Sequence, residues 1–277
     1  MPPPPAASAV SLTDLAIAFG LAGGGRYTAV EAIGLAVRPG EFVAIVGPTG
    51  CGKSTLLNAA AGLVRPAAGK VEIFGAALLG LNGRAGYLFQ QDALMPWKTA
   101  LDNVAVALEP KGVAQAKAHE QARGWLARVG LSAFLDRYPH MLSGGQKKRV
   151  ALAQVLIRDP EILLMDEPFG PLDAQTRLQL QNQLLQLWQQ RPGTTIVFIT
   201  HDLNEAIALA DRVVVMTRRP GRIKAVFPVP IPRPRDIFSL QRDPTFRDLH
   251  DQIWTILEDE MRVDERLESV SPSASHG

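Results

Sequence analysis

Short, uninterrupted apolar runs recur along the chain and are its most informative pattern. They occupy residues 42–46, 162–165, 195–199 and 213–216. Strands that are apolar on both faces are typical of a parallel sheet buried between two layers of helices. The runs therefore predict an α/β protein with a central, mostly parallel sheet and helices on each side.

The N-terminal part of the chain has a different pattern. Residues 12–19, 33–37 and 70–74 alternate more between apolar and polar positions, and turns containing glycine and proline separate them. This alternation predicts antiparallel strands that form an edge subdomain beside the parallel sheet. Residues 99–138 show helical spacing and little strand character. An inserted α-helical subdomain, over about residues 91–150, is therefore expected to interrupt the sheet.

Prolines dominate the segment that follows the last apolar run. The prolines at positions 228, 230, 232 and 234 predict an extended, polyproline-like connector. The arginines between them are expected on a solvated basic surface, with a binding role as the alternative. Apolar residues at helical spacing then predict a short amphipathic helix. The residues of its apolar face are Phe246, Leu249, Ile253, Ile256 and Leu257.

These patterns divide the chain into four parts. A main domain covers residues 10–227, and the connector with its helix covers residues 228–268. Residues 1–9 and 269–277 show no periodicity, so both ends are expected to be disordered.

Composition and charge narrow the classes of function. Of the 277 residues 47% are hydrophobic and 20% charged, and no apolar stretch approaches the roughly 18 residues of a membrane-spanning helix. The chain has 29 lysines and arginines against 27 aspartates and glutamates, and a net charge of +2 does not predict nucleic-acid binding. The single cysteine, Cys51, excludes an internal disulfide, and residues 1–6 lack the features of a secretory signal. A cytoplasmic protein is therefore expected, which would act at a membrane only through a partner.

A glycine-rich loop directly follows the first of the apolar runs. Residues 47–54 match the pattern GxxxxGK[ST], and a helical segment comes next. In such a loop the backbone N–H groups point at one centre, the helix dipole favours an anion, and the lysine and serine reach phosphates and Mg²⁺. The order of strand, loop and helix favours a triphosphate site over a chance glycine-rich turn. The loop consists of Gly47, Pro48, Thr49, Gly50, Cys51, Gly52, Lys53 and Ser54.

Two adjacent carboxylates, Asp166 and Glu167, end another of the apolar runs. A buried strand end holds two ions only if each finds a cation, a donor or a metal. In a phosphate site Asp166 would hold Mg²⁺, directly or through water, and Glu167 would accept a proton from an attacking water. Taken alone, the pair is equally typical of a solvated turn.

A second glycine-rich segment, residues 142–146, precedes another predicted helix. Ser143 and Gln146 have the spacing of a capping box, so this helix start also presents exposed N–H groups to an anion. One ATP needs only one phosphate loop, and an ordinary capped helix would explain the segment equally well. The other motifs in the chain decide between these interpretations.

Over about residues 10–217 the chain resembles the ATP-binding subunit of ABC transporters. Residues 47–55 match the Walker A motif, residues 162–166 with Glu167 match the Walker B motif, and residues 142–146 match the family's signature. The remaining elements also agree in order. Phe19 resembles the aromatic residue that stacks on adenine, and residues 89–90 resemble the Q-loop. Residues 170–173 resemble the D-loop, and residues 200–202 resemble the switch-histidine segment. Independent coincidence of all these motifs is not credible.

The chain departs from the family pattern in a few places. Phe19 stands where tyrosine is more usual, and an insertion around residues 23–25 lengthens the turn that follows it. Tyr27 is therefore the alternative aromatic residue for adenine. Pro171 stands where alanine is common.

The resemblance implies roles for the motif residues. Glu167, His201, Lys53 and Gln90 would be catalytic, and Ser54, Gln90 and Asp166 would hold Mg²⁺. In the family two cassettes pair head to tail, so the signature of one covers the γ-phosphate of ATP held by the other. The implied ATP contacts are Phe19, Gly47, Pro48, Thr49, Gly50, Cys51, Gly52, Lys53, Ser54, Thr55, Gln90, Ser143, Gly144, Gly145, Gln146, Asp173 and His201.

Two local features resemble the cassettes of bacterial importers for nitrate, sulfonates and taurine. They are residues 94–97 with 101–104, and residues 216–223 with the proline-rich 230–235. This resemblance implies an importer cassette that is peripheral at the cytoplasmic face of the inner membrane. Its partners would be integral membrane permease subunits, a second copy of the chain when ATP is bound and, indirectly, a periplasmic solute-binding protein.

Two other classes remain as alternatives. One is another ABC transport system such as an exporter, and the other is an ABC-type ATPase that acts on nucleic acid. The heptad arms of DNA-acting relatives do not occur between Lys53 and Asp166, so no nucleic-acid partner is expected. The sequence does not indicate which solute is transported, because the solute would not contact this chain.

Overall fold

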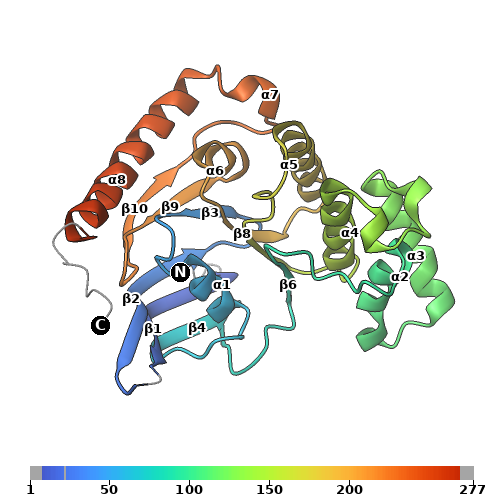
Figure 1. Ribbon diagram of the computed structural model, residues 1–277, viewed down its shortest axis with the longest axis horizontal. Helices are drawn as coiled ribbons and strands as arrows, with labels where there is room; N and C mark the ends of the chain where they lie inside the picture. Colours follow the sequence, from blue (N-terminus) through green and yellow to red (C-terminus); the bar gives the residue numbers. More distant parts are fainter. Residues whose placement is uncertain (1–7, 22, 269–277) are drawn as a thin grey trace, which may run out of the picture.

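A six-stranded sheet forms the centre of the molecule (Figure 1). The computed structural model describes residues 8–21 and 23–268. The strand order is β10-β9-β3-β8-β7-β6, and all neighbouring strands are parallel except β10 and β9. The strands are β3 (Phe42–Val46), β6 (Ala85–Leu88), β7 (Ile162–Asp166), β8 (Thr195–Ile199), β9 (Arg212–Met216) and β10 (Ile223–Pro228). The parallel sheet predicted from the apolar runs is confirmed.

Both faces of this sheet are buried, which explains why its strands do not alternate. In β3, Phe42, Ala44 and Val46 belong to one apolar core, whereas Val43 and Ile45 belong to another. Successive side chains of a strand lie on opposite faces, so a strand covered on both sides needs apolar residues throughout. The helices are α1 (Lys53–Ala60), α2 (Ala100–Ala105), α3 (Gln115–Arg128), α4 (Gly144–Leu156), α5 (Ala174–Gln189), α6 (Leu203–Leu209), α7 (Ile237–Leu240) and α8 (Pro244–Glu268).

The alternating N-terminal segments form an antiparallel sheet of their own, in the order β2-β1-β4-β5. Its strands are β1 (Val10–Gly20), β2 (Arg26–Val37), β4 (Ala68–Ile73) and β5 (Ala76–Ala77). Leu12 and Ile17 of β1 share an apolar core with Leu56 and Leu57 of α1 and with one face of the parallel sheet. Helix α1 and the loop before it are therefore held between the two sheets (Figure 1).

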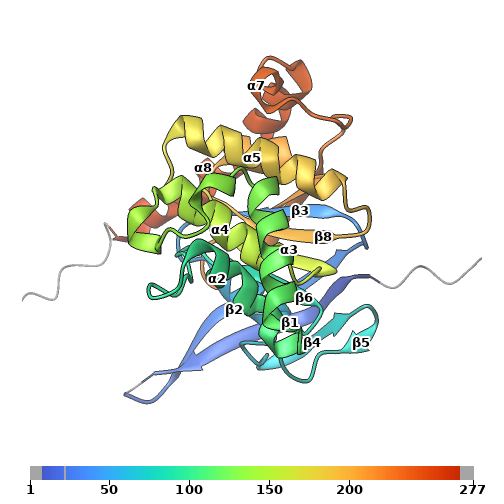
Figure 2. The same cartoon turned by 90° about the vertical axis from the view of Figure 1, so that its right-hand side faces the viewer.

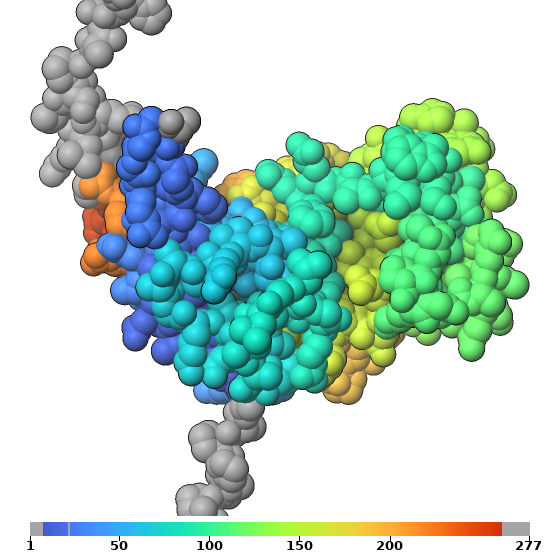
Figure 3. Space-filling model, turned by 90° about the horizontal axis from the view of Figure 1, so that it is seen from below, coloured from blue at the N-terminus to red at the C-terminus, as the bar shows by residue number. Residues whose placement is uncertain are grey.

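The predicted helical subdomain forms a lobe at one side of the molecule (Figures 1 and 3) and faces the viewer in Figure 2. Helices α2 and α3 pack against each other and against α4, which connects the lobe to the sheet. Asn103 of α2 is fully buried. Its amide donates to the carbonyl oxygens of Met95, Lys98 and Thr99 at 2.9–3.1 Å, which fixes the segment that leads into the lobe.

The arginines of the proline-rich segment do not lie on a solvated surface. Arg235 is only 6% exposed. Its Nη1 donates to three carbonyl oxygens at the end of α6. The last carbonyl groups of a helix have no N–H partner within the helix, so they need donors from elsewhere. The three oxygens belong to Ile207, Ala208 and Ala210, at 3.2, 3.2 and 2.7 Å. Burial, together with the charge of half-buried Arg233, lowers the pKa of Arg235 to about 10, so the guanidinium is still charged at neutral pH. The predicted solvated basic surface is wrong for these two residues.

Two C-terminal elements also differ from the prediction. Strand β10 extends the sheet as far as Pro228, the first of the prolines, where no strand was predicted, and its residues alternate between half-buried and exposed positions. Helix α8 has 25 residues rather than being short. Its predicted apolar stripe is confirmed, since Phe246, Leu249, Ile253 and Leu257 are buried and α8 packs against α6.

The ends of the described chain add two observations. Ala9, predicted to be disordered, is fully buried, and its N–H donates to the carbonyl oxygen of Val37 at 2.8 Å. Ser8 is also among the described residues. The other residues predicted to be disordered, 1–7 and 269–277, lie outside the described residues. Among the helices that the structure describes, none combines the length and the apolar character needed to cross a membrane.

Candidate functional site

The glycine-rich loop between β3 and α1 has the conformation that phosphate binding requires. Gly50 and Gly52 have φ angles of 72° and 99°, a region of backbone conformation that favours glycine. Lys53 is buried, and its Nζ donates to the carbonyl oxygens of Gly47 and Pro48 at 2.8 and 2.9 Å. The loop thus combines the N-terminus of α1 with a cation held in its centre.

The serine of this loop lies next to the first strand-end carboxylate. Ser54 Oγ donates to Asp166 Oδ1 at 3.0 Å. Burial raises the pKa of Asp166, while the hydrogen bond from Ser54 opposes this shift and the charge of Glu167 adds to it. A hydroxyl and a carboxylate so close together are oxygen ligands of the kind that Mg²⁺ prefers, so the pair fits this metal. The described residues contain no cluster of three or more histidine, cysteine or acidic side chains that could hold a metal without help from a substrate.

Glu167, Gln90 and His201 come together from three different loops. The Oε2 atom of Glu167 lies 3.2 Å from His201 Nδ1 and 3.3 Å from Gln90 Nε2. Glu167 has a φ angle of 43°, which is uncommon for a residue with a side chain. Its N–H donates to the carbonyl oxygen of Ile199 in β8 at 3.0 Å, which holds this turn in place. Strained residues of this kind are frequent at active sites, where the surrounding structure fixes them.

A cleft of about 420 Å³ contains many of the predicted ATP contacts. This volume lies within the roughly 300–1,000 Å³ of small-molecule sites. Phe19 and Tyr27 are paired directly across β1 and β2, so both candidate aromatic residues reach the cleft. The cleft is lined by Phe19, Tyr27, Ala29, Thr49, Gly50, Gly52, Lys53, Ser54, Thr55, Gln90, Glu167 and Arg219.

The second glycine-rich segment lies outside this cleft. Ser143 Oγ accepts the N–H of Gln146 at 3.3 Å, and the Gln146 side chain accepts the N–H of Ser143 at 3.0 Å, so the predicted capping box is confirmed. A Cβ on Gly145 would lie 2.4 Å from the side chain of Thr176, which shows that the segment packs closely against α5. Several predicted ATP contacts do not line this cleft in the described part of the chain. They include Ser143, Gly144, Gly145, Gln146 and Asp173. The predicted ATP contacts are therefore divided between two surfaces.

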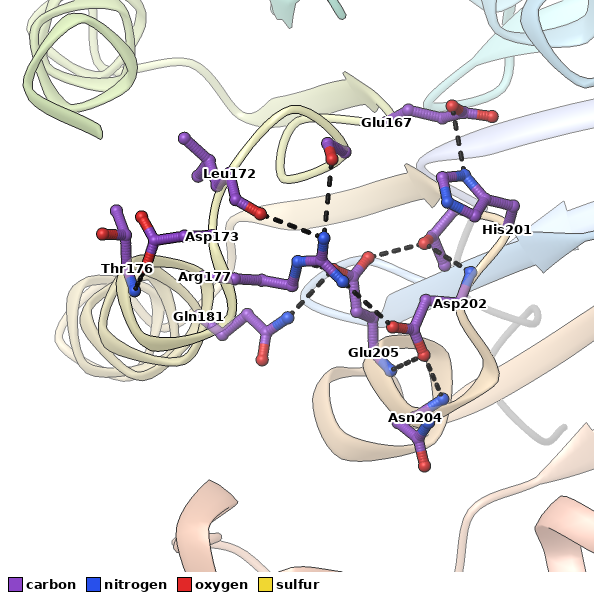
Figure 4. A network of polar contacts seen from close by, with 12 residues as sticks. Glu167, Leu172, Asp173, Thr176, Arg177, Gln181, His201, Asp202, Asn204 and Glu205 are labelled. Carbon is purple, nitrogen blue, oxygen red and sulfur yellow. Dashed lines mark hydrogen bonds and ion pairs between the residues drawn. The ribbon is translucent and has the colours of Figure 1, made fainter. Parts of the chain in front are cut away.

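An arginine that the sequence analysis did not single out connects the loops after β7 and β8 (Figure 4). Arg177 of α5 donates to the carbonyl oxygen of Leu172 at 3.1 Å, and its guanidinium also lies 3.5 Å from a carboxylate oxygen of Asp202. Glu205 lies behind this pair, and burial raises its pKa despite a hydrogen bond from Thr200. Arg177 thus ties the segment with Asp173 to the segment with His201.

A second overlooked residue is Lys148, a lysine that is only 2% exposed. Its Nζ lies 2.8 Å from Asp92 Oδ1 and donates to the carbonyl oxygens of Gln90 and Phe89 at 3.0 and 3.3 Å. It therefore anchors the loop that carries Gln90 to α4, the helix that Ser143 caps. The sequence holds a signal for it, because Lys148 precedes Ala151 and Leu152 by three and four residues and so shares their buried helix face.

Comparisons with known proteins agree with this arrangement. A family model described as ABC transporter matches residues 30–170. An uncharacterized ABC transporter ATP-binding protein of Methanocaldococcus jannaschii is 48% identical over 86% of this chain and 87% of its own. The nitrate import ATP-binding protein NrtC of Synechococcus elongatus is 40% identical over 88% of this chain and 38% of its own. An ATP-binding cassette solved as a dimer in a post-hydrolysis state, with ADP and Pi bound, has a TM-score of 0.71 and 31% identity over 79% of this chain and 98% of its own.

Proposed function

Since this chain belongs to the ABC transporter family, in which it is an ATP-binding cassette with ATPase activity, we propose that it drives a bacterial importer of the nitrate, sulfonate and taurine type. The similarity to a nitrate import protein supports the direction and the class of solute. The segments 94–97 and 216–223, which resemble those of such importers, support the same assignment.

The observation that carries the proposed chemistry is the position of Glu167. Its carboxylate lies at the cleft that Lys53 and Ser54 also line, and His201 and Gln90 both contact its Oε2 atom. A carboxylate oriented in this way can accept a proton from a water that attacks the terminal phosphorus atom of ATP. In such a reaction the protein mainly positions groups and neutralises charge.

The other residues of the cleft supply position and charge. Lys53 and the N-terminus of α1 neutralise the phosphates, and either Phe19 or Tyr27 contacts the adenine. Ser54 and Asp166, with Gln90 nearby, would hold Mg²⁺, which when bound neutralises charge on the phosphate oxygens. His201 orients Glu167 and the terminal phosphate through its ring nitrogens.

The division of the predicted contacts between two surfaces supports a shared site. Ser143, Gly144 and Asp173 are exposed, and neither they nor the first residues of α4 line the cleft of their own chain. In a head-to-tail dimer these groups would cover the γ-phosphate that the partner holds. The dimeric form of the related cassette supports this arrangement.

The cassette would work at the cytoplasmic face of the membrane on integral permease subunits. The exposed side chains of Phe89 and Trp97, near the Gln90 loop, offer a surface for such a partner. A periplasmic solute-binding protein would select the solute.

Replacing Glu167 with glutamine tests the proposed chemistry. The variant should bind ATP as the wild type does and lose about 10²–10⁴ in turnover, since the proton acceptor is gone. The purified variant and a matched control, Glu120→Gln on the exposed side of α3, are compared for ATP binding and steady-state hydrolysis. Hydrolysis near the wild-type rate in Glu167→Gln would refute the role of Glu167.

A further inference from the structure

The loop between β9 and β10, residues 217–222, packs against the phosphate loop. Gly221 donates its N–H to the carbonyl oxygen of Ala29 at 2.9 Å and accepts the N–H of Glu31 at 3.0 Å, so it is bonded to β2. A Cβ on Gly221 would lie 2.0 Å from the carbonyl oxygen of Cys51. Only a glycine permits this close approach, which places the 217–222 loop beside the mouth of the cleft.

Arg219 in this loop is directed toward the cleft. Its Nε donates to the carbonyl oxygen of Gly50 at 2.5 Å, and its guanidinium carbon lies 5.3 Å from the centre of the Tyr27 ring. Arg222 of the same loop differs, because it pairs with Glu31 and does not line the cleft.

The cleft is lined by groups of two kinds. Lys53, Ser54 and the N-terminus of α1 suit phosphate groups. Phe19, Tyr27 and Arg219 contribute two aromatic rings and a planar cation, and Arg219 lies between Gly50 of the phosphate loop and the Tyr27 ring. A planar guanidinium beside aromatic rings suits a flat heteroaromatic group, which it can cover while it donates hydrogen bonds to the edge.

We propose that Arg219 is a nucleotide-binding residue that packs on the base of bound ATP opposite the aromatic residues of β1 and β2. This inference rests on the proposal that the cleft binds ATP. A base between two planar groups needs about 7 Å, twice the contact distance of about 3.5 Å. The guanidinium therefore moves away from Tyr27 by about 2 Å when the base enters, which a long and exposed side chain permits.

The test compares a ligand that carries the base with one that consists of phosphates only. Calorimetric titration of the full chain with ADP and with inorganic tripolyphosphate, both with Mg²⁺, gives the two affinities. Arg219→Ala should weaken ADP binding about tenfold and leave tripolyphosphate binding unchanged. Arg219→Lys should recover only part of the ADP affinity, because lysine keeps the charge and loses the planar fork. The control Arg222→Ala should bind both ligands as the wild type does.

Two results would overturn the proposal. Unchanged ADP affinity in Arg219→Ala would show that Arg219 does not contact the nucleotide. An equal loss for ADP and tripolyphosphate would show that its partner is a phosphate rather than the base. If the wild-type chain itself bound no ADP, the proposed ATP site would fail as well, and this outcome is distinct because it does not depend on Arg219.

Discussion

Replacing Lys148 with methionine should release the loop that carries Gln90. The ammonium of Lys148 is buried between Asp92 and two backbone carbonyl oxygens of this loop, at distances of 2.8, 3.0 and 3.3 Å. Methionine keeps most of the volume of the side chain and removes all three interactions. The change therefore tests the anchor without creating a large cavity.

The structure sets the size of the expected effect. Breaking a fully buried ion pair costs about 3–5 kcal/mol. Here the side chain of Asp92 is 22% exposed and Gln90 is exposed, so water can replace part of the lost interaction. The free energy of unfolding should fall by about 1–3 kcal/mol, the cost of leaving a polar group without its partner. Turnover should fall about tenfold, since Gln90 would no longer be held beside Glu167.

Urea unfolding and steady-state ATP hydrolysis measure the two effects. Lys117→Met on α3 is the matched control, because it is the same substitution at an exposed position of the helical lobe. Lys148 itself does not line the cleft, so any change in the KM for ATP would act through Gln90, which does. A variant that loses stability and keeps its full kcat would show that Lys148 only supports the fold, and the reasoning about Gln90 would be refuted.

Two further predictions concern the fold around the site. Arg235→Met should lower the free energy of unfolding by about 2–4 kcal/mol, because it leaves the final carbonyl groups of α6 without donors. The control Arg242→Met, at an exposed position, should change this free energy by less than about 0.5 kcal/mol. If urea unfolding gave equal losses for the two variants, the capping role of Arg235 would be contradicted. Because burial raises the pKa of Glu205 above its ordinary 4.5, wild-type stability includes a contribution that declines as pH rises from 4.5 through the folded pKa. The free energy of unfolding is measured between about pH 4 and pH 7 for the wild type and for Glu205→Gln. The wild type should lose stability relative to the variant as pH rises. A difference between the two proteins that stays constant with pH would show that Glu205 does not titrate in this way.

The sequence predicts those parts of the site that depend on neighbouring residues. The phosphate loop, the carboxylates at the end of β7 and the capping box at Ser143 are short motifs whose local geometry follows from residue type and spacing. The parallel sheet follows in the same way from its apolar strands.

The contacts that hold these motifs together were not predictable from the same patterns. Lys148 and Arg235 bond to backbone carbonyl groups of a distant loop and a distant helix end, and Arg177 reaches the distant side chain of Asp202. Carbonyl groups occur at every residue, so no sequence pattern marks which of them a buried cation will find. For the same reason a row of arginines between prolines resembled a solvated surface, whereas Arg235 in fact caps α6.

A mixing experiment tests most directly whether each ATP is held by two chains. Lys53→Ala removes the phosphate-loop cation and Ser143→Arg blocks the signature segment, so either variant alone should be inactive. In a mixed dimer one site would contain both substitutions and the other would contain neither. An equal mixture should therefore regain about a quarter of the wild-type hydrolysis rate, because half of the dimers are mixed and each has one of two sites. A mixture no more active than the two separate variants would contradict a site shared between chains.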